Sequence, residues 1–243
     1  VGIIIINMFF FSEYWDAIPP ITRFILLMNI ALSLAVSLEL VSSFQLYFNW
    51  HSIANKGQWY RILTSLFHQG ELQPHNFFEF LIFYWNSSRL EQQDFRNRPG
   101  DFVFFIFFIY SSSLVCASFV GLKFLQTCLS TSMIYLWSKR NPNDTIEIMM
   151  IYSLKAKFLP LLFLASHFLF HTAKKEELVG ICMCHLYYFA VDVVPKIPET
   201  YKLNVLKTPA WLSAVCAHLI VNEQDHLGLG NLVEEEEGEQ LLM

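Results

Sequence analysis

The sequence predicts an all-α polytopic membrane protein in which six helices cross a bilayer and pack into a bundle. Three observations predict this class: charged residues are scarce, uncharged apolar runs recur, and basic residues concentrate in alternate connections between the runs. Of the 243 residues, 54% are hydrophobic and only 15% are charged, whereas soluble domains carry about 25% charged residues. The composition excludes a disordered chain and a solvated nucleic-acid binder, so we expect a lipid bilayer and no nucleic acid among the partners.

The first three predicted spans lie in the N-terminal half of the chain. A bilayer core needs about 20 mostly apolar residues per helix. Residues 24–38 and 102–122 are free of charge, whereas Glu71 and Glu79 interrupt the weakest span, residues 66–86. A carboxylate inside a membrane is costly and usually faces a cavity, so we expect a polar groove near Glu79.

The last three predicted spans are short. Residues 124–138 are uncharged, residues 158–173 extend back through the apolar stretch 148–154, and residues 178–191 end at Asp192. A hydrophobic length below the bilayer thickness is accommodated by thinning, by snorkelling or by burial among other helices. The short spans therefore predict a protein that distorts the surrounding bilayer.

The basic residues set the expected orientation. Six spans place both termini on one side, and that side carries 11 of the 16 basic residues while the other side carries 5. Basic residues favour the cytosolic side of a membrane, so both termini are predicted to be cytosolic. The 11 residues are Arg23, Arg89, Arg96, Arg98, Lys139, Arg140, Lys155, Lys157, Lys196, Lys202 and Lys207.

The chain divides into three predicted regions. Residues 1–22 form a cytosolic lead, residues 23–195 form the membrane domain, and residues 196–243 form a cytosolic tail with an acidic end. Met8 is an alternative initiator, and residues 1–7 would then be a gene-model artefact. The net charge of −5 separates into −7 after Lys207 and +2 before it, so the acidity is a property of the tail.

The five cysteines predict neither a disulfide framework nor a metal centre. Cys182, Cys184 and His185 form a tempting cluster, but they lie in an uncharged run where small residues favour helix packing. We expect no metal and no cofactor.

Several motifs in order along the chain resemble one known family. The sequence is similar to the Derlin family across roughly residues 13–212. The motifs are Ile18-Pro19-Pro20-Ile21-Thr22-Arg23, Phe44-Gln45-Leu46-Tyr47-Phe48-Asn49, Leu90-Glu91 with Phe95-Arg96-Asn97-Arg98, Tyr135-Leu136-Trp137-Ser138-Lys139-Arg140-Asn141-Pro142, Phe158-Leu159-Pro160, His185-Leu186-Tyr187-Tyr188-Phe189 and Leu206-Lys207-Thr208-Pro209.

The resemblance implies a fold, a location and a role. Derlins are rhomboid-like pseudoproteases of the endoplasmic reticulum (ER) membrane with six helices and cytosolic ends. They assist ER-associated degradation (ERAD), in which misfolded ER proteins return to the cytosol. The implied partners are misfolded ER client proteins, a valosin-containing-protein-type ATPase and a membrane-embedded ubiquitin ligase complex.

Protease activity is the main alternative, because active rhomboids use a serine and a histidine inside the membrane. Ser130 and Ser132 are the candidate nucleophiles in the fourth span, and His185 is the candidate base in the sixth. Active rhomboids carry Gly-x-Ser-Gly at this place, whereas residues 126–132 contain no glycine. We therefore predict no catalytic residue and expect these polar groups to form hydrogen bonds between helices.

Three residues of the last span are predicted to pack against a neighbouring helix. Gly180 and Cys184 lie four residues apart on one helix face, where the resemblance implies a Gly-x-x-x-Gly motif that lets two backbones approach. Cys184 departs from that motif but is small, and His185 belongs to the same family pattern.

Trp59, Tyr60 and Arg61 are predicted to anchor a loop in the lipid. The resemblance implies a Trp-Arg motif here, in a luminal loop that dips into the membrane. Aromatic rings favour the headgroup level and arginine can snorkel to phosphate. An ordinary aromatic belt residue is the alternative interpretation.

The remaining family motifs supply residues that we interpret as structural. These residues are Gln45, Asn49, Glu91, Arg96, Trp137, Asn141 and Pro142. Within the short connection that follows the second span, a carboxylate bond from Glu91 to the backbone or an ion pair is the expected role.

The tail carries a degenerate form of a family motif. Gly228 and Gly230 precede the glutamate run, and the resemblance implies that a Gly-x-Gly motif in the tail binds the ATPase. A flexible acidic tail is the alternative. Two further alternatives for the whole chain are a structural adaptor of the ligase and a protein importer of a complex-plastid membrane.

Overall fold

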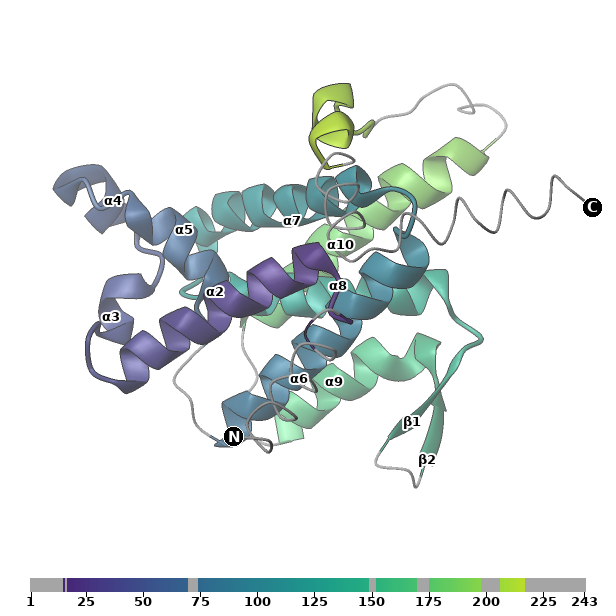
Figure 1. Ribbon diagram of the computed structural model, residues 1–243, viewed down its shortest axis with the longest axis horizontal. Helices are drawn as coiled ribbons and strands as arrows, with labels where there is room; N and C mark the ends of the chain where they lie inside the picture. Colours follow the sequence, from purple (N-terminus) through teal and green to yellow (C-terminus); the bar gives the residue numbers. More distant parts are fainter. Residues whose placement is uncertain are drawn as a thin grey trace, which may run out of the picture.

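The computed structural model describes residues 15, 17–69, 74–148, 152–169, 175–197 and 206–216. Within these ranges the chain is a helical bundle with one small β-hairpin (Figure 1). Each of the six predicted spans contains a helix, which confirms the helical membrane bundle. These helices are α2 (Pro20–Ser37), α6 (Pro74–Arg89), α7 (Pro99–Val120), α8 (Gln126–Arg140), α9 (Leu159–Leu169) and α10 (Lys175–Tyr188).

Three helical segments of the described chain are long and apolar enough to cross a membrane. They are Pro20–Ser37, Pro99–Val120 and Lys175–Lys196, and Ala156–Ala165 is a shorter apolar helix. The third segment extends α10 through a π-helical turn, η3 (Phe189–Val193), and a 3₁₀ turn, η4 (Val194–Lys196). The structure therefore contains full-length and short helices in one bundle.

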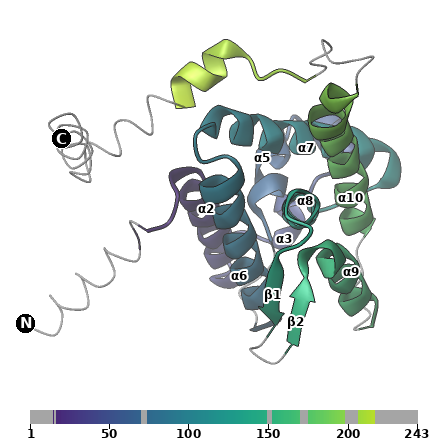
Figure 2. The ribbon, with the colours of Figure 1, turned by 90° about the vertical axis from the view of Figure 1, so that its right-hand side faces the viewer.

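Helix α8 occupies the centre of the bundle. Figure 2 views α8 end-on, with α2, α6, α9, α10 and α7 around it. Its side chains from Cys128 to Ser138 are all buried, although four of them are serine or threonine. A helix that is enclosed by other helices needs no apolar surface toward lipid, so its interior faces can carry hydrogen-bonding groups.

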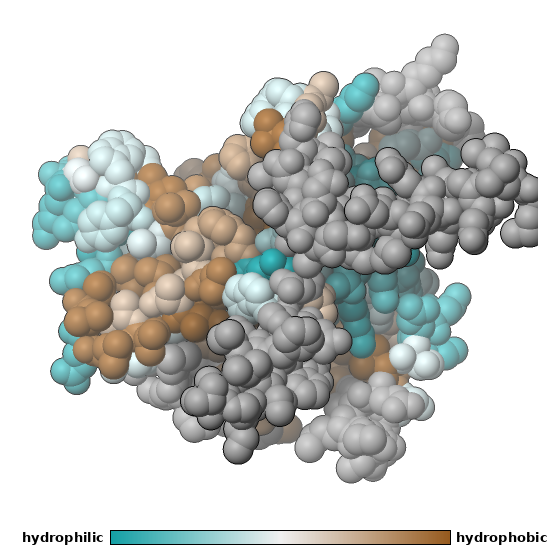
Figure 3. Space-filling view, in the orientation of Figure 1, coloured by the Kyte–Doolittle hydropathy of each residue, from teal (hydrophilic) through white to brown (hydrophobic). Residues whose placement is uncertain are grey.

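Helix α2 buries small polar residues on one face and exposes apolar residues on the other. Thr22, Asn29 and Ser33 are buried, whereas Phe24 and Leu34 are exposed. Hydrophobic residues gather over the outer face of α2 in Figure 3. In a membrane this arrangement places apolar side chains against lipid and small polar side chains against protein.

Three short helices join α2 to α6. They are α3 (Ser43–Leu46), α4 (Trp50–Lys56) and α5 (Tyr60–Phe67). The Phe48 N–H donates to the Lys123 carbonyl at 2.8 Å, and the Leu125 N–H donates to the Ser65 carbonyl at 2.9 Å. These bonds attach this connection to the turn between α7 and α8. The predicted span 66–86 was therefore set too early, because α5 is a separate helix and α6 begins at Pro74.

A β-hairpin corrects the prediction that the fifth span extends back through residues 148–154. Strand β1 (Thr145–Ile148) pairs antiparallel with β2 (Tyr152–Lys155), with Ile146 opposite Leu154. Polar and apolar residues alternate in Thr145-Ile-Glu-Ile, and β-branched residues favour strands. A short 3₁₀ turn, η2 (Ala156–Phe158), then leads into α9.

Candidate functional site in the helical bundle

Helices α8 and α10 are in backbone contact at Gly180. A Cβ added to Gly180 would lie 2.5 Å from the carbonyl oxygen of Cys128 and 3.0 Å from its Cα. One turn further along α10, the Cys184 thiol donates to the Ser132 carbonyl at 3.1 Å. The two small residues that the sequence singled out therefore lie at the interface of the central helix with α10.

Ser132 and His185, two of the residues that would form a protease site, have other partners, and Ser130 lines a separate small pocket. Ser132 Oγ lies 2.6 Å from the Cys128 carbonyl oxygen and 2.9 Å from that of Gly180. His185 Nδ1 lies 2.7 Å from the Tyr135 hydroxyl. A nucleophilic serine needs its base within hydrogen-bond reach, and the structure brings His185 to Tyr135 instead of to Ser132.

A small polar pocket of about 10 Å³ lies beside α8. Glu79 and Ser130 contribute to its lining, and the buried Oε1 of Gln69 has no hydrogen-bond partner among the described residues. A volume of this size admits about one water molecule where several polar groups converge. The predicted polar surroundings of Glu79 therefore exist as a narrow pocket between α6, α8 and α9.

The predicted loop anchor divides into an outward part and an inward part. The Trp59 side chain is 66% exposed and Tyr60 is 48% exposed, whereas Arg61 is only 7% exposed. Arg61 Nη1 donates to the carbonyls of Phe44 at 2.9 Å and Tyr47 at 3.0 Å. In the structure Arg61 therefore faces the protein and not lipid phosphate, because the carbonyls around α3 offer it acceptors. The lipid contact of the two aromatic rings stays a prediction.

Glu91 binds the N-terminus of α2. Its carboxylate accepts hydrogen bonds from the Ile21 N–H at 3.0 Å, the Thr22 N–H at 2.8 Å and the Thr22 hydroxyl at 2.7 Å. The first N–H groups of a helix lack partners within the helix, and Pro19 supplies no side-chain cap. Glu91 lies in a π-helical turn, η1 (Leu90–Asp94), which continues α6.

Trp137 and Asn141 connect the end of α8 to the same turn. The Trp137 Nε1–H donates to Gln93 Oε1 at 3.5 Å, and Asn141 Nδ2 donates to Asp94 Oδ1 at 3.3 Å. Burial raises the pKa of the Asp94 carboxyl, while the bond from Asn141 lowers it. Arg96 and Pro142 are exposed nearby.

Gln45 and Asn49 lie at the opposite end of the molecule, in the α3–α4 region. Asn49 Oδ1 caps α4 by accepting from the Ser52 N–H at 3.3 Å. Gln45 is exposed, and its N–H donates to the Ser42 carbonyl at 2.8 Å. The structure thus separates the predicted motif residues into a core group, a loop group and a group at the other end.

The ion pair between Arg140 and Asp192 was not predicted from the sequence. Arg140 at the end of α8 binds Asp192 in η3 through Nε at 3.1 Å and Nη2 at 3.0 Å. The Arg140 guanidinium also lies over the Phe95 ring, 4.7 Å from its centroid. The sequence signal for this pair is the opposite charges that follow the fourth and the sixth predicted spans.

Gly228 and Gly230 of the tail lie outside the described residues. The described residues contain no cluster of metal-ligating side chains.

Comparison with known proteins identifies the family. The model of the Der1-like family matches residues 18–210. The probable derlin-2 homolog of Dictyostelium discoideum is 29% identical over 209 residues, which are 83% of this chain and 81% of the relative. Derlin-2.2 of Arabidopsis thaliana is 26% identical over 217 residues, which are 85% of this chain and 88% of the relative. The match covers the whole helical bundle, and the chain belongs to the Der1-like family.

Proposed function

We propose that the protein is a non-catalytic factor of ERAD that assists the retrotranslocation of misfolded proteins from the ER to the cytosol. Membership of the Der1-like family supports a role in this process. The observation that carries the mechanistic proposal is the connection between α2 and α6, which presents aromatic side chains outward while Arg61 holds it from inside.

The exposed side of this connection suits a lipid-embedded position. Phe44, Trp50, Tyr60 and Leu63 are exposed on the short helices α3, α4 and α5, and Trp59 is exposed directly before α5. An exposed apolar surface of this kind marks a membrane or protein contact, and amphipathic helices bury such a surface in the headgroup region. Inserted there, the connection would displace lipid from one leaflet beside the bundle.

Helix lengths add a second reason for a thin membrane at the protein. Helix α2 has 18 residues, which correspond to about 27 Å at 1.5 Å per residue, against a bilayer core of about 30 Å. Helix α8 has 15 residues but is enclosed by the other helices, so its shortness does not act on lipid. A thinner bilayer shortens the path over which each charged group of a client is penalised.

We place the proposed lateral groove at the polar pocket, which holds about one water molecule in this structure, so α6, α8 and α9 have to move apart there to admit a client. Glu79, Thr127 and Thr131 line the pocket where α6, α8 and α9 meet. Polar groups at this depth give an unfolded segment hydrogen-bonding partners that lipid does not offer. The groove would admit a client, and a cytosolic ATPase would supply the force.

The charged ends of the helices support the predicted topology. Bonds from Thr22 to Glu91 and from Arg140 to Asp192 join the start of α2, the end of α6, the end of α8 and the end of α10 on one side. We assign this side to the cytosol, with the protein in the ER membrane and both termini cytosolic. A valosin-containing-protein-type ATPase and a membrane-embedded ubiquitin ligase complex would act there on misfolded ER clients.

Complementation of cells that lack the protein tests the function and the protease alternative together. Loss of the protein should slow the degradation of a misfolded luminal client in a pulse-chase measurement. A copy with His185→Ala and a copy with both Ser130→Ala and Ser132→Ala should each restore the wild-type rate, because none of these three side chains acts as a catalyst. Unchanged client decay after loss of the protein would contradict the proposal, and failure of rescue by both copies would favour a protease.

A further inference from the structure

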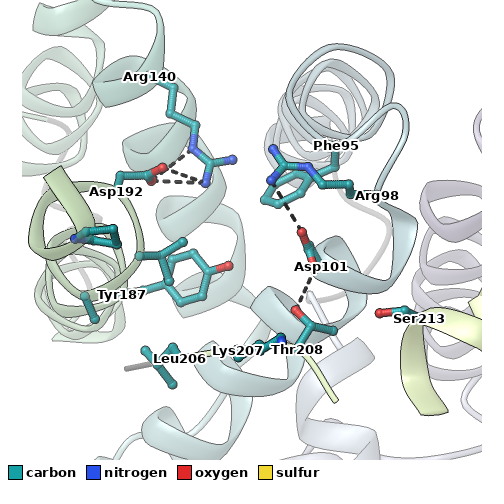
Figure 4. A pocket seen from close by; sticks show the side chains of 13 residues that line it. Phe95, Arg98, Asp101, Arg140, Tyr187, Asp192, Leu206, Lys207, Thr208 and Ser213 are labelled. Carbon is teal, nitrogen blue, oxygen red and sulfur yellow. Dashed lines mark hydrogen bonds and ion pairs between the residues drawn. The ribbon is translucent and has the colours of Figure 1, made fainter. Parts of the chain in front are cut away.

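A cavity of about 450 Å³ lies at the same end of the bundle as the Arg140–Asp192 pair (Figure 4). It lies between the start of α7, the ends of α8 and α10, and the segment 206–216. The proposed function uses none of this space. Ligand pockets in proteins occupy about 300–1,000 Å³, so the cavity is large enough for a small molecule or a lipid headgroup.

The segment 206–216 is fixed against α7 and completes the wall of the cavity. The Thr208 hydroxyl donates to Asp101 Oδ1 at 2.6 Å. A Cβ added to Gly100 would lie 2.8 Å from the Ser213 Cα, so the two backbones are in contact. These two contacts hold the segment 206–216 in place as a wall of the cavity.

The hydrogen-bonding groups of the cavity are unbalanced toward donors. Both oxygens of Asp192 accept from Arg140, Asp101 Oδ1 accepts from Thr208, and Asp101 Oδ2 pairs with Arg98 at 3.7 Å. Within the described ranges Lys207 has no hydrogen bond or ion pair, Arg98 has only the 3.7 Å pair through Nη1, and Arg140 keeps Nη1 unused. A ligand that fits must bring acceptors and negative charge, and phosphate does both.

Tyr187 adds a donor from the floor of the cavity. Its side chain is only 2% exposed, and Figure 4 shows its hydroxyl directed into the cavity. The rings of Phe105 and Phe108 hold it, with centroid distances of 5.0 and 5.4 Å. No hydrogen bond to this hydroxyl occurs among the residues that the structure describes. The hydroxyl is therefore available to donate to a group that enters the cavity.

We propose that this cavity binds the phosphate group of a membrane lipid headgroup of the phosphoinositide type, with Arg98, Lys207 and Tyr187 as donors. Basic pockets between transmembrane helices on the cytosolic side suit such headgroups. The apolar part of the lining, which includes Val191 and Leu206, suits the glycerol and the first acyl carbons. A soluble phosphate offers the same chemistry, and the experiment separates the two sources.

Binding is measured on the full-length protein in nanodiscs. One set contains phosphatidylcholine alone, and another adds a fluorescent phosphatidylinositol monophosphate. We expect saturable binding of the labelled lipid that unlabelled phosphatidylinositol monophosphate displaces. Displacement by inorganic phosphate or inositol phosphate at similar concentrations would support the site and assign it to a soluble ligand. Displacement by phosphatidylcholine would contradict a phosphate site for anionic headgroups.

Matched variants locate the binding. Arg98→Gln and Lys207→Gln should each weaken binding about fivefold, as expected for one basic residue near an anionic headgroup. Tyr187→Phe keeps the ring and the charge but removes the donor, and it should also weaken binding. Lys157→Gln removes an exposed charge outside the cavity and should bind like the wild type. The proposal is wrong if the three cavity variants bind like the wild type, or if Lys157→Gln loses as much affinity as they do.

Discussion

At the scale of single residues, Glu91 controls the start of a helix that lies 69 residues earlier in the chain. The bonds that Glu91 accepts from Ile21 and Thr22 replace the cap that Pro19 does not supply. A carboxylate at a helix N-terminus also interacts favourably with the helix dipole. One side chain therefore joins α2 to the π-helical turn after α6.

Glu91→Ala should destabilise the protein by about 3–6 kcal/mol, because hydrogen bonds to a charged group contribute about 1.5–3 kcal/mol each and two N–H groups lose their acceptor. Thermal unfolding in detergent measures the loss. Arg96→Ala, an exposed change in the same connection, is the matched control and should stay within about 0.5 kcal/mol of the wild type. Equal melting of the two variants would exclude the capping role.

Arg61 is a second residue whose role follows from where its side chain points, which is into the protein. Its guanidinium binds Gln58 Oε1 at 2.6 Å as well as two carbonyls, and the fork of donors cannot be reproduced by lysine. Arg61→Ala and Arg61→Lys should both loosen the connection between α2 and α6. We expect faster proteolysis of that connection by an added protease, with little change in the fragments that contain α8. His51→Ala, an exposed change on α4, should leave the cleavage rate unchanged.

At the scale of elements, the sequence predicts where helices occur better than it predicts whether lipid or other helices surround each one. Uncharged runs mark five of the six segments because lipid excludes charge, and Glu71 and Glu79 interrupt the remaining one, residues 66–86. The central place of α8 was not predicted, since Gln126 and its serines and threonines lower the hydropathy of a helix that other helices enclose. The hairpin was missed because apolar residues between charges fit a strand and a helix end equally well.

The same limit applies to the candidate site. The spacing of four residues is enough to predict that Gly180 and Cys184 share a helix face, and in the structure both residues contact α8. The directions of Arg61 and His185 did not follow from spacing, because each depends on a hydrogen-bond partner in another segment, at Phe44 and Tyr135. Local sequence sets periodicity, whereas partners across the bundle set the orientation of polar side chains.

Gly180→Ala tests the contact of α8 with α10. The added methyl would meet backbone atoms of Cys128 and not a movable side chain, and overpacking of this kind costs about 1–3 kcal/mol. We expect a lower melting temperature in detergent and a shorter lifetime in cells. Cys182→Leu adds bulk at an exposed place on the same helix and should have little effect. If Cys182→Leu lowered stability as much as Gly180→Ala, the specific contact would not explain the loss.

At the scale of the whole molecule, polar contacts hold the two ends of the bundle while apolar side chains face outward between them. Glu91 and Arg140 join the helices at one end. At the other end, Arg61 joins the short helices to one another, and the bond from Phe48 to Lys123 attaches them to the turn between α7 and α8. The connection between α2 and α6 is thus an attached platform that exposes the Trp59 and Tyr60 rings beside polar residues such as His51 and Lys56. We expect the aromatic rings to enter the headgroup region.

The whole-molecule prediction concerns this surface. Replacing Trp59 and Tyr60 together by Ser removes two exposed rings and leaves the acceptors of the Arg61 hydrogen bonds in place. Of the contacts of Arg61 it removes the one with the Tyr60 ring, whose centroid lies 5.8 Å from the guanidinium carbon. Stability should change little, because exposed side chains contribute little to folding, whereas the affinity of the platform for lipid should fall. A nitroxide label near Gly57 should then report greater access to a water-soluble quencher.

Client degradation should slow in the same cells, because the bilayer beside the bundle would regain its thickness. Phe119→Ser removes an exposed aromatic ring at the end of α7, outside the platform, and serves as the matched control for lost apolar area. If both variants support wild-type client decay while the label shows the platform withdrawn from lipid, membrane insertion of the platform is not needed for transport. If only the Trp59 and Tyr60 variant slows decay at unchanged protein level, the aromatic platform links this fold to its work on the membrane.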